Sequence, residues 1–255
     1  MTPPPSALRT LAFGELERGI WGAAWAPAAD GSGLTALGGA SAVTAGSGLR
    51  LSVDEDAGEW RLGGERAALT ISPAGEVVAV GATGDGVEGF DQLCRVTGRF
   101  ALGDGEQEVE CLGLRTSRSG GFDLGKLGSL RAVSTWFEPD EGLALMAFRA
   151  RKAKSHDGDV ITAAVLGPET SAAVEDPRLS TTYDASGWPV RAGLELWIAR
   201  EDGDEDEQYP RRASGEATGA RAESADGELQ LRAEPFRWHS RGRDGAGMYI
   251  LARRR

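Results

Sequence analysis

The stretch from Leu179 to Ile198 holds the residue types best suited to acid-base chemistry in this chain. Glu195 and Asp184 are carboxylic acids whose pKa would rise on burial, which would let either act as a general acid. Arg191 would hold an anionic head group, because a guanidinium pairs well with carboxylate or phosphate oxygens. We therefore treat the two acids as candidate catalytic residues and Arg191 as a candidate ligand-binding residue.

Aromatic residues near this stretch would form the walls of an apolar binding site. Tyr183 precedes Asp184, and Trp197 lies two residues after Glu195. Trp136 opens the second half of the chain, where an amphipathic indole suits the mouth of a barrel. We predict that Tyr183, Trp197 and Trp136 contact a ligand together with Arg191.

The role of Glu195 depends on which face of a strand it occupies. Residues 190–198 alternate with a period of two, which buries Val190, Leu194 and their neighbours and places Arg191, Glu195 and Trp197 on the other face. If that second face lines a cavity between domains, it is a site. If it meets solvent, it is a ladder of ion pairs.

Signatures of other chemistry are absent from the sequence. There is no phosphate loop of the Walker type, no Gly-x-Ser-x-Gly elbow and no Cys-x-x-Cys pair. The two histidines, His156 and His239, would both have to join carboxylates to hold a metal. We predict no metal and no cofactor.

Charge and composition restrict the partners. The net charge of −11 would repel nucleic acid and anionic membrane surfaces. No apolar run approaches the ~20 residues of a membrane span, and residues 1–6 lack the pattern of a signal peptide. We expect a cytoplasmic protein with two free thiols, Cys94 and Cys111, and an apolar small molecule as its partner.

The segments between these residues are typical of short antiparallel strands joined by tight turns. Asp-Gly pairs favour type I′ hairpins because both residues tolerate a positive φ. No segment has the pattern of a capped, three-turn helix. Short strands at regular spacing predict an all-β sandwich or barrel. Seven Asp-Gly pairs begin at Asp30, Asp85, Asp104, Asp157, Asp202, Asp226 and Asp244.

A pattern shared by two halves of the chain indicates an internal duplication. Trp25 and Trp136 each precede a Pro, a Gly and a Leu-rich segment. Two arginines recur 117 positions later without a gap. Two copies at so long a period predict two similar domains rather than a solenoid, whose repeats span about 20–50 residues. The recurring arginines are Arg61 with Arg178 and Arg95 with Arg212.

A strand ending in Arg95-Val-Thr-Gly98 precedes a hairpin at Asp104-Gly105 and a return strand from Glu108 to Arg115. This order, followed by a second similar domain, resembles the tandem lipocalin-like proteins of the carotenoid hydratase and AttH type. The resemblance implies two consecutive antiparallel calycin-like barrels with an apolar cavity. Residues 113–121 depart from the group's pattern, since they contain no Asp, His or Trp.

The fold class is therefore expected to be all-β, with two tandem antiparallel lipocalin-like barrels. We expect a lead-in over residues 1–20, a first barrel over 21–118 and a second over 119–255. Three functions stay open. The protein binds an apolar small molecule, or it is a cofactor-free hydratase, isomerase or cyclase for an isoprenoid or polyketide-like substrate, as the resemblance implies, or its barrels are filled and structural.

Overall fold

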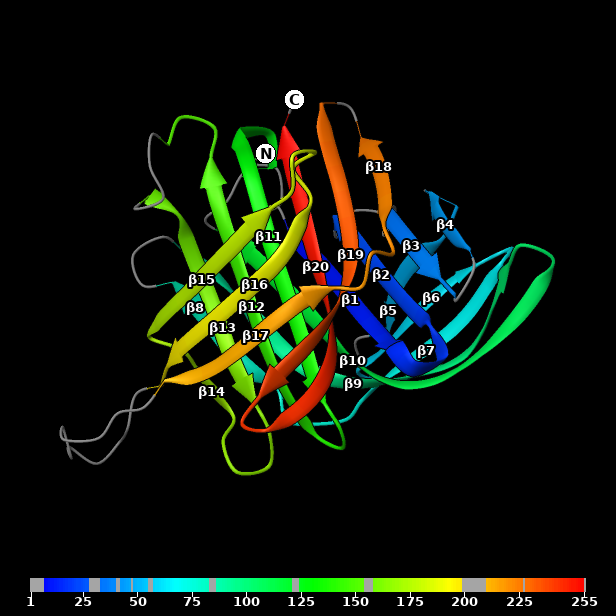
Figure 1. Ribbon diagram of the computed structural model, residues 1–255, viewed down its shortest axis with the longest axis horizontal. Coiled ribbons are helices and arrows are strands. Elements are labelled where there is room, and N and C mark those ends of the chain that lie inside the picture. The colour runs from blue at the N-terminus through cyan, green and yellow to red at the C-terminus, as the bar shows by residue number, and fades with distance from the viewer. Residues whose placement is uncertain are drawn as a thin grey trace.

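The computed structural model consists of two ten-stranded antiparallel sheets that follow one another along the chain (Figure 1). The helical segments among the described residues are two short 3-10 turns, η1 (Leu16–Arg18) and η2 (Leu124–Lys126), and no described helix is long or apolar enough to cross a membrane. The structure describes residues 7–27, 33–39, 42–46, 48–54, 57–82, 86–120, 124–153, 158–198, 210–226 and 228–254.

The first sheet has the strand order β4-β3-β2-β1-β10-β9-β7-β6-β5, and β8 pairs with β9 beside this path. Its strands are β1 (Leu8–Glu15), β2 (Ile20–Pro27), β3 (Leu34–Gly38), β4 (Val43–Gly46), β5 (Arg50–Asp54), β6 (Glu59–Gly64), β7 (Ala67–Pro73), β8 (Val78–Ala82), β9 (Val87–Leu102) and β10 (Gly105–Gly120).

The second sheet has the order β14-β13-β12-β11-β20-β19-β17-β16-β15, and β18 pairs with β19. Its strands are β11 (Leu127–Phe137), β12 (Glu141–Ala150), β13 (Val160–Leu166), β14 (Ala172–Ala173), β15 (Asp176–Tyr183), β16 (Pro189–Trp197), β17 (Arg211–Ala217), β18 (Ala222–Asp226), β19 (Leu229–Ser240) and β20 (Arg243–Arg254).

Each strand of the first sheet has a counterpart ten strands later, in the same place of the same order. The predicted all-β fold and the internal duplication are therefore confirmed. β1 already begins at Leu8, inside the stretch predicted as a lead-in. In the described residues no ladder joins β4 to β5 or β14 to β15, so each sheet is an open half-barrel.

The predicted register of the repeat is wrong. Trp25 lies on β2 and Trp136 on β11, the counterpart of β1. Arg178 lies on β15, whereas Arg61 lies on β6, whose counterpart is β16. The recurring arginines and turns are common residue types in this chain, and their spacing does not follow the strand order. Arg95 and Arg212 are likewise on non-equivalent strands, β9 and β17.

Three apolar clusters form the core. One fills the first barrel and includes Phe13, Trp60 and both cysteines, which are buried free thiols, as predicted. Another fills the second barrel and includes Phe236 and Trp238. The third lies between the two sheets.

The third cluster forms a seam that joins the barrels. Trp25 and Trp136 belong to it, so Trp136 lies between the sheets and not at the mouth of a barrel, where we expected it. β18 lies against β4 of the other sheet, and β8 lies against β13 and β14 (Figure 1). The indole N–H of Trp136 donates to the carbonyl of Gly14, 3.1 Å away across the seam.

The hairpin turns follow the Asp-Gly pattern in part. Asp104 lies in the β9–β10 turn, as predicted. Asp244 lies inside β20, because the turn before it uses Arg241 and Gly242, both at positive φ (51° and 75°), as a type I′ turn requires. Asp226 ends β18 at a turn. The pairs at Asp30, Asp85, Asp157 and Asp202, and also His156, lie outside the described residues.

Candidate functional site

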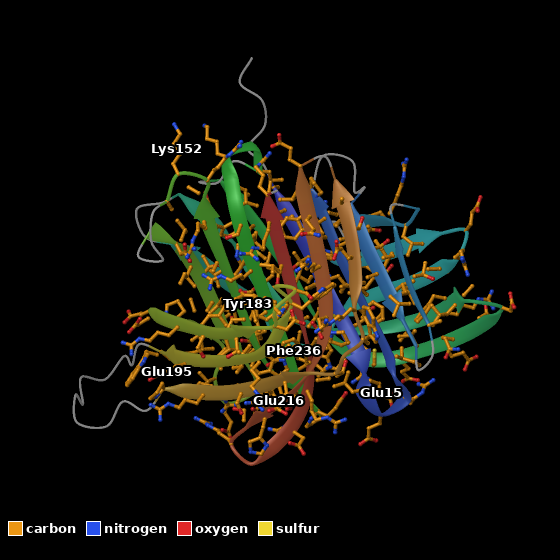
Figure 2. All side chains as sticks on the ribbon, turned by 45° about the horizontal axis from the view of Figure 1, so that its top comes forward. Glu15, Lys152, Tyr183, Glu195, Glu216 and Phe236 are labelled. Carbon is orange, nitrogen blue, oxygen red and sulfur yellow. The ribbon has the colours of Figure 1, made fainter. Side chains whose placement is uncertain are left out.

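Arg191 and Glu195 lie on the outer face of β16, away from the core of the second barrel. Arg191 is exposed and pairs with Glu216 at 3.2 Å, and Glu195 pairs with Arg212 at 3.2 Å. Figure 2 shows Glu195 and Glu216 near the lower margin of the second barrel, with Tyr183 nearer the middle of the molecule. The structure therefore places Arg191 and Glu195 in a ladder of ion pairs rather than in a cavity between the domains.

Glu195 does border a shallow groove of about 490 Å³ on this outer face. Gly193, Arg212 and His239 are among the other residues that line it. His239 is paired with Asp244 at 2.9 Å. Among the described residues that line the groove, Glu195 is the acid, and its side chain is 31% exposed and paired with Arg212.

Asp184 organises the turn between β15 and β16. Its Oδ1 accepts hydrogen bonds from the backbone amides of Ser186 and Trp188, at 2.8 and 3.0 Å. The amide of Trp188, the largest cause, and the guanidinium of Arg221 lower the pKa of Asp184. A carboxylate held ionised in this way is a poor proton donor, so Asp184 is not suited to act as a general acid.

Trp136 lies at a cleft of about 440 Å³ where the two barrels meet. The cleft is acidic, because Glu15, Glu110 and Glu138 line it and Arg237 is the basic group beside them. Trp197 lies elsewhere, as the last residue of β16, and is half-buried. Its indole nitrogen is buried and has no partner among the described residues. Neither indole joins Tyr183.

Tyr183 reaches toward the interior of the second barrel. Its hydroxyl lies 3.4 Å from that of Tyr249, which also contacts the hydroxyl of Thr181 at 3.0 Å. Tyr249 is fully buried, and burial raises the pKa of its phenol. Tyr183 is 39% exposed, so the three hydroxyls lead from solvent into the barrel.

Glu234 is a buried acid that the sequence-based predictions missed. Its residue is 0% exposed, and its Oε2 has no hydrogen-bond partner among the described residues. Its other oxygen accepts from Nε of Arg221 at 3.3 Å. Burial, the largest cause, raises the pKa of Glu234, and Arg221 offsets part of this rise.

Strand alternation explains why Glu234 points into the barrel. Phe236 and Trp238 share its side of β19 and belong to the core of the second barrel. The rings of Phe236 and Tyr249 lie 5.7 Å apart, and those of Phe236 and Trp238 lie 5.9 Å apart. The alternation of Phe236 and Trp238, carried back by two residues along the strand, is the sequence signal that would have found Glu234.

The inward face of β12, β11, β20 and β19 is built in rungs of directly opposed residues. The polarity changes along the strands, from an apolar core to an arginine-rich mouth. The deep rung is Leu145, Val133, Tyr249 and Glu234; the middle rung is Ala147, Arg131, Leu251 and Arg232; the outer rung is Arg149, Ser129, Arg253 and Gln230.

The arginines of the two upper rungs surround Tyr183. Asp159, whose side chain is buried, pairs with Arg131 at 2.5 Å and with Arg149 at 2.6 Å. The guanidinium of Arg253 lies 6.0 Å from the centre of the Tyr183 ring. Arg232 donates to the carbonyls of Ser186 and Gly187, 2.9 Å away, which fixes the β15–β16 turn over this end of the barrel.

Trp188 packs against Arg221, the arginine that pairs with Glu234. The guanidinium groups of Arg221 and Arg232 lie 5.0 and 4.8 Å from the centre of its ring. Tyr183, which is 39% exposed, lies beside the same end of the barrel. Among the described residues, no cluster of His, Cys, Asp and Glu side chains is arranged to hold a metal.

Comparisons with known proteins show the fold of this chain. No family model matches it, and no curated protein does. An AttH-like protein from Nitrosomonas europaea is 11% identical, with a TM-score of 0.63 over 97% of this chain and 92% of that one. CghA, in a structure with Sch210972, is 11% identical, with a TM-score of 0.60 over 98% and 89% of the two chains.

Kievitone hydratase from Nectria haematococca is 9% identical, with a TM-score of 0.51 over 98% of this chain and 88% of that one. At these identities the likeness concerns the fold. The chain has the tandem lipocalin-like fold of the AttH and carotenoid hydratase-like group, which confirms the resemblance seen in the sequence.

Proposed function

We propose that the second barrel binds an apolar small molecule and converts it by acid catalysis, as a cofactor-independent hydratase, isomerase or cyclase. Glu234 is the acid. The observation that carries this proposal is a fully buried carboxyl group with a raised pKa and one oxygen without a partner among the described residues.

The surroundings of Glu234 suit proton transfer to an apolar substrate. A carboxyl group with a raised pKa keeps more of its proton near neutral pH, and positioned acids of this kind contribute about 10²–10⁴-fold to a rate. The adjacent rings of Tyr249 and Phe236 would stabilise a cation that develops on the protonated substrate. The hydroxyls of Tyr183 and Thr181 would orient a water molecule or a substrate hydroxyl.

Proteins with the same fold support this class of reaction by analogy. One of them is named a hydratase, and another has been solved with a small molecule, Sch210972. The substrate that we propose for this chain is an isoprenoid or polyketide-like compound, the class implied by the resemblance seen in the sequence.

The test compares two isosteric substitutions. A panel of apolar alkenes and alcohols is screened for binding by native mass spectrometry, and bound compounds are then followed for conversion. We expect E234Q to retain binding and to lose about 10²–10⁴-fold in turnover. E195Q, on the outer face, is the matched control and should turn over normally. Equal turnover in wild type and E234Q would show that Glu234 is not the acid.

Binding without conversion is the second candidate function. The contact between Arg221 and Glu234 favours it, because a guanidinium 3.3 Å away stabilises the ionised carboxylate. In that case the wild-type protein would release each bound compound unchanged, and E234Q would alter affinity alone.

A further inference from the structure

We propose that the small molecule bound by the second barrel carries a carboxylate, which Arg253 holds at the mouth together with Arg131 and Arg149. The inference rests on the proposed function, since it concerns the same barrel, and it specifies the class of ligand as an amphipathic organic acid.

The charge balance at the mouth favours an anion. Asp159 is one carboxylate shared by two guanidinium groups, those of Arg131 and Arg149. Arg253 forms no ion pair among the residues that the structure describes, and its near neighbour is the ring of Tyr183. Three guanidinium groups and one carboxylate, those of Arg131, Arg149, Arg253 and Asp159, thus gather at this end of the barrel.

The geometry favours a carboxylate on the ligand. The guanidinium group offers a planar fork of N–H donors that matches two carboxylate oxygens. The side chains of Arg131 and Arg149 are 12% and 25% exposed, so an ion pair formed with them is screened less than one at the open surface. Asp159 already holds these two arginines in place, which reduces the entropy lost when a ligand binds.

The distance between the arginines and Glu234 along the strands indicates how long the ligand would be. Successive rungs are two residues apart on each strand, or about 7 Å, so the outer rung lies about 13 Å from the deep rung. A molecule whose carboxylate sits between Arg131 and Arg253 would therefore place a carbon about 7–13 Å further in beside Glu234. Apolar residues of the deep rung, Val133 and Leu145, would contact its hydrocarbon part.

Binding of decanoic acid and 1-decanol, measured by isothermal titration calorimetry at a pH where the acid is ionised, tests this inference. We expect wild type to bind the acid about tenfold more tightly than the alcohol, the size of a charged hydrogen bond. R253M should lose most of this preference, and R253K should keep part of it. R191M, which removes an exposed arginine from the outer face, should keep all of it.

Equal affinity for acid and alcohol, no measurable binding of the acid, or an unchanged preference in R253M would overturn the inference. Thermal unfolding of each variant checks that it is folded, and R253Q replaces R253M if that variant is not. The experiment measures equilibrium binding and needs no turnover. If the protein prefers the acid but converts no compound, the acid catalysis is refuted and the carboxylate site is supported. If it converts a compound but shows no preference for the acid, the carboxylate site is refuted and the acid catalysis is supported.

Discussion

The deep rung of the second barrel has an equivalent in the first barrel, and each contains a pair of polar residues. The two pairs differ in whether their polar atoms have hydrogen-bond partners. The first residue of β8 pairs with Asp91 on β9, and the first residue of β18 pairs with Ala233 on β19. Asp91 and Ala233 are therefore equivalent, and so are the residues that follow them, Gln92 and Glu234. Their partners across the ladder are Arg115 in the first barrel and Tyr249 in the second.

In the first barrel the side chain of Gln92 is bound by the guanidinium group of Arg115. Arg115 donates twice to Oε1 of Gln92, at 2.9 and 2.5 Å, and once to the carbonyl of Gly58 at 2.6 Å. Its guanidinium also lies 5.3 Å from the centre of the Trp60 ring. Each of the three guanidinium nitrogens of Arg115 therefore has a hydrogen-bond acceptor.

In the second barrel the place of Gln92 is taken by Glu234, whose Oε2 has no hydrogen-bond partner among the described residues. Leaving a buried polar atom without a partner costs about 1–3 kcal/mol. The same place in the first barrel avoids this cost, because Gln92 accepts a hydrogen bond from Arg115. The comparison therefore favours a functional reason for Glu234 over a structural one.

A second difference lies on the seam. Arg118 and Asp91 form an ion pair at 2.7 Å, and both side chains are 0% exposed. Arg118 also donates to Thr162 of the second sheet at 2.9 Å and to the carbonyl of Phe90 at 2.8 Å. By the same register, the second copy has Ala252 and Ala233 at these places, so only the first copy has a charged pair here.

The largest effect on stability is expected for R118M. Removing one partner of a buried pair leaves an uncompensated charge, which costs about 3–5 kcal/mol. Asp91 would retain its carboxylate, one oxygen of which already lacks a partner among the described residues. Urea denaturation of wild type and R118M measures the loss.

The double variant D91A/R118M sharpens the comparison, because it makes this part of the first copy apolar, like the second. We expect it to be more stable than R118M, since the buried charge is gone. A double variant less stable than R118M would mean that the contacts of Asp91, rather than its unpaired charge, hold the seam.

The next prediction concerns the pH dependence of stability at Glu234. Because its pKa is raised on folding, the folded protein binds this proton more tightly than the unfolded chain. The contribution of Glu234 is therefore full below its unfolded pKa, near 4.5, and is lost as pH rises through the folded value. We expect E234Q to gain stability relative to wild type as pH increases above about 4.5.

Glu228 provides a control of opposite sign. Its hydrogen bond to Arg254, the largest cause, lowers its pKa, so its stabilisation appears above the unfolded pKa and is lost on acidification. E228Q should thus lose a little stability relative to wild type as pH rises, and the effect is small because the pair is exposed. Parallel curves for E234Q and wild type would place Glu234 in an environment where its pKa is normal.

The sequence was sufficient for features that depend on local pattern. Alternation and turn residues predict an all-β, duplicated chain, because period and turn chemistry are properties of short segments. The register of the duplication was missed since it depends on which strands pair. The connection between β16 and β17 spans residues 198–210, whereas β6 and β7 are joined by two residues, so equivalent strands drift apart in numbering.

The candidate site depends on the same pairing of strands. Tyr183 was predicted to contact a ligand, which stays a prediction, and its hydroxyl contacts that of Tyr249. Glu195 and Glu234 are both acids on alternating strands, and alternation alone does not say which strand turns its acid inward. In β16 the apolar residues take the inner face, whereas in β19 the acid shares the inner face with Phe236 and Trp238.

The smallest effects are expected for R191M and E195Q on the outer face. Both residues belong to exposed or half-exposed ion pairs, with Glu216 and Arg212. Pairs of this kind contribute about 0.2–1 kcal/mol because water and salt screen them. We expect each variant to unfold within about 1 kcal/mol of wild type, and the difference to shrink further in 1 M salt. A loss above about 2 kcal/mol, or a change in ligand binding, would mean that β16 presents this face to something other than solvent, and the contrast between its outer face and the deep rung would no longer hold.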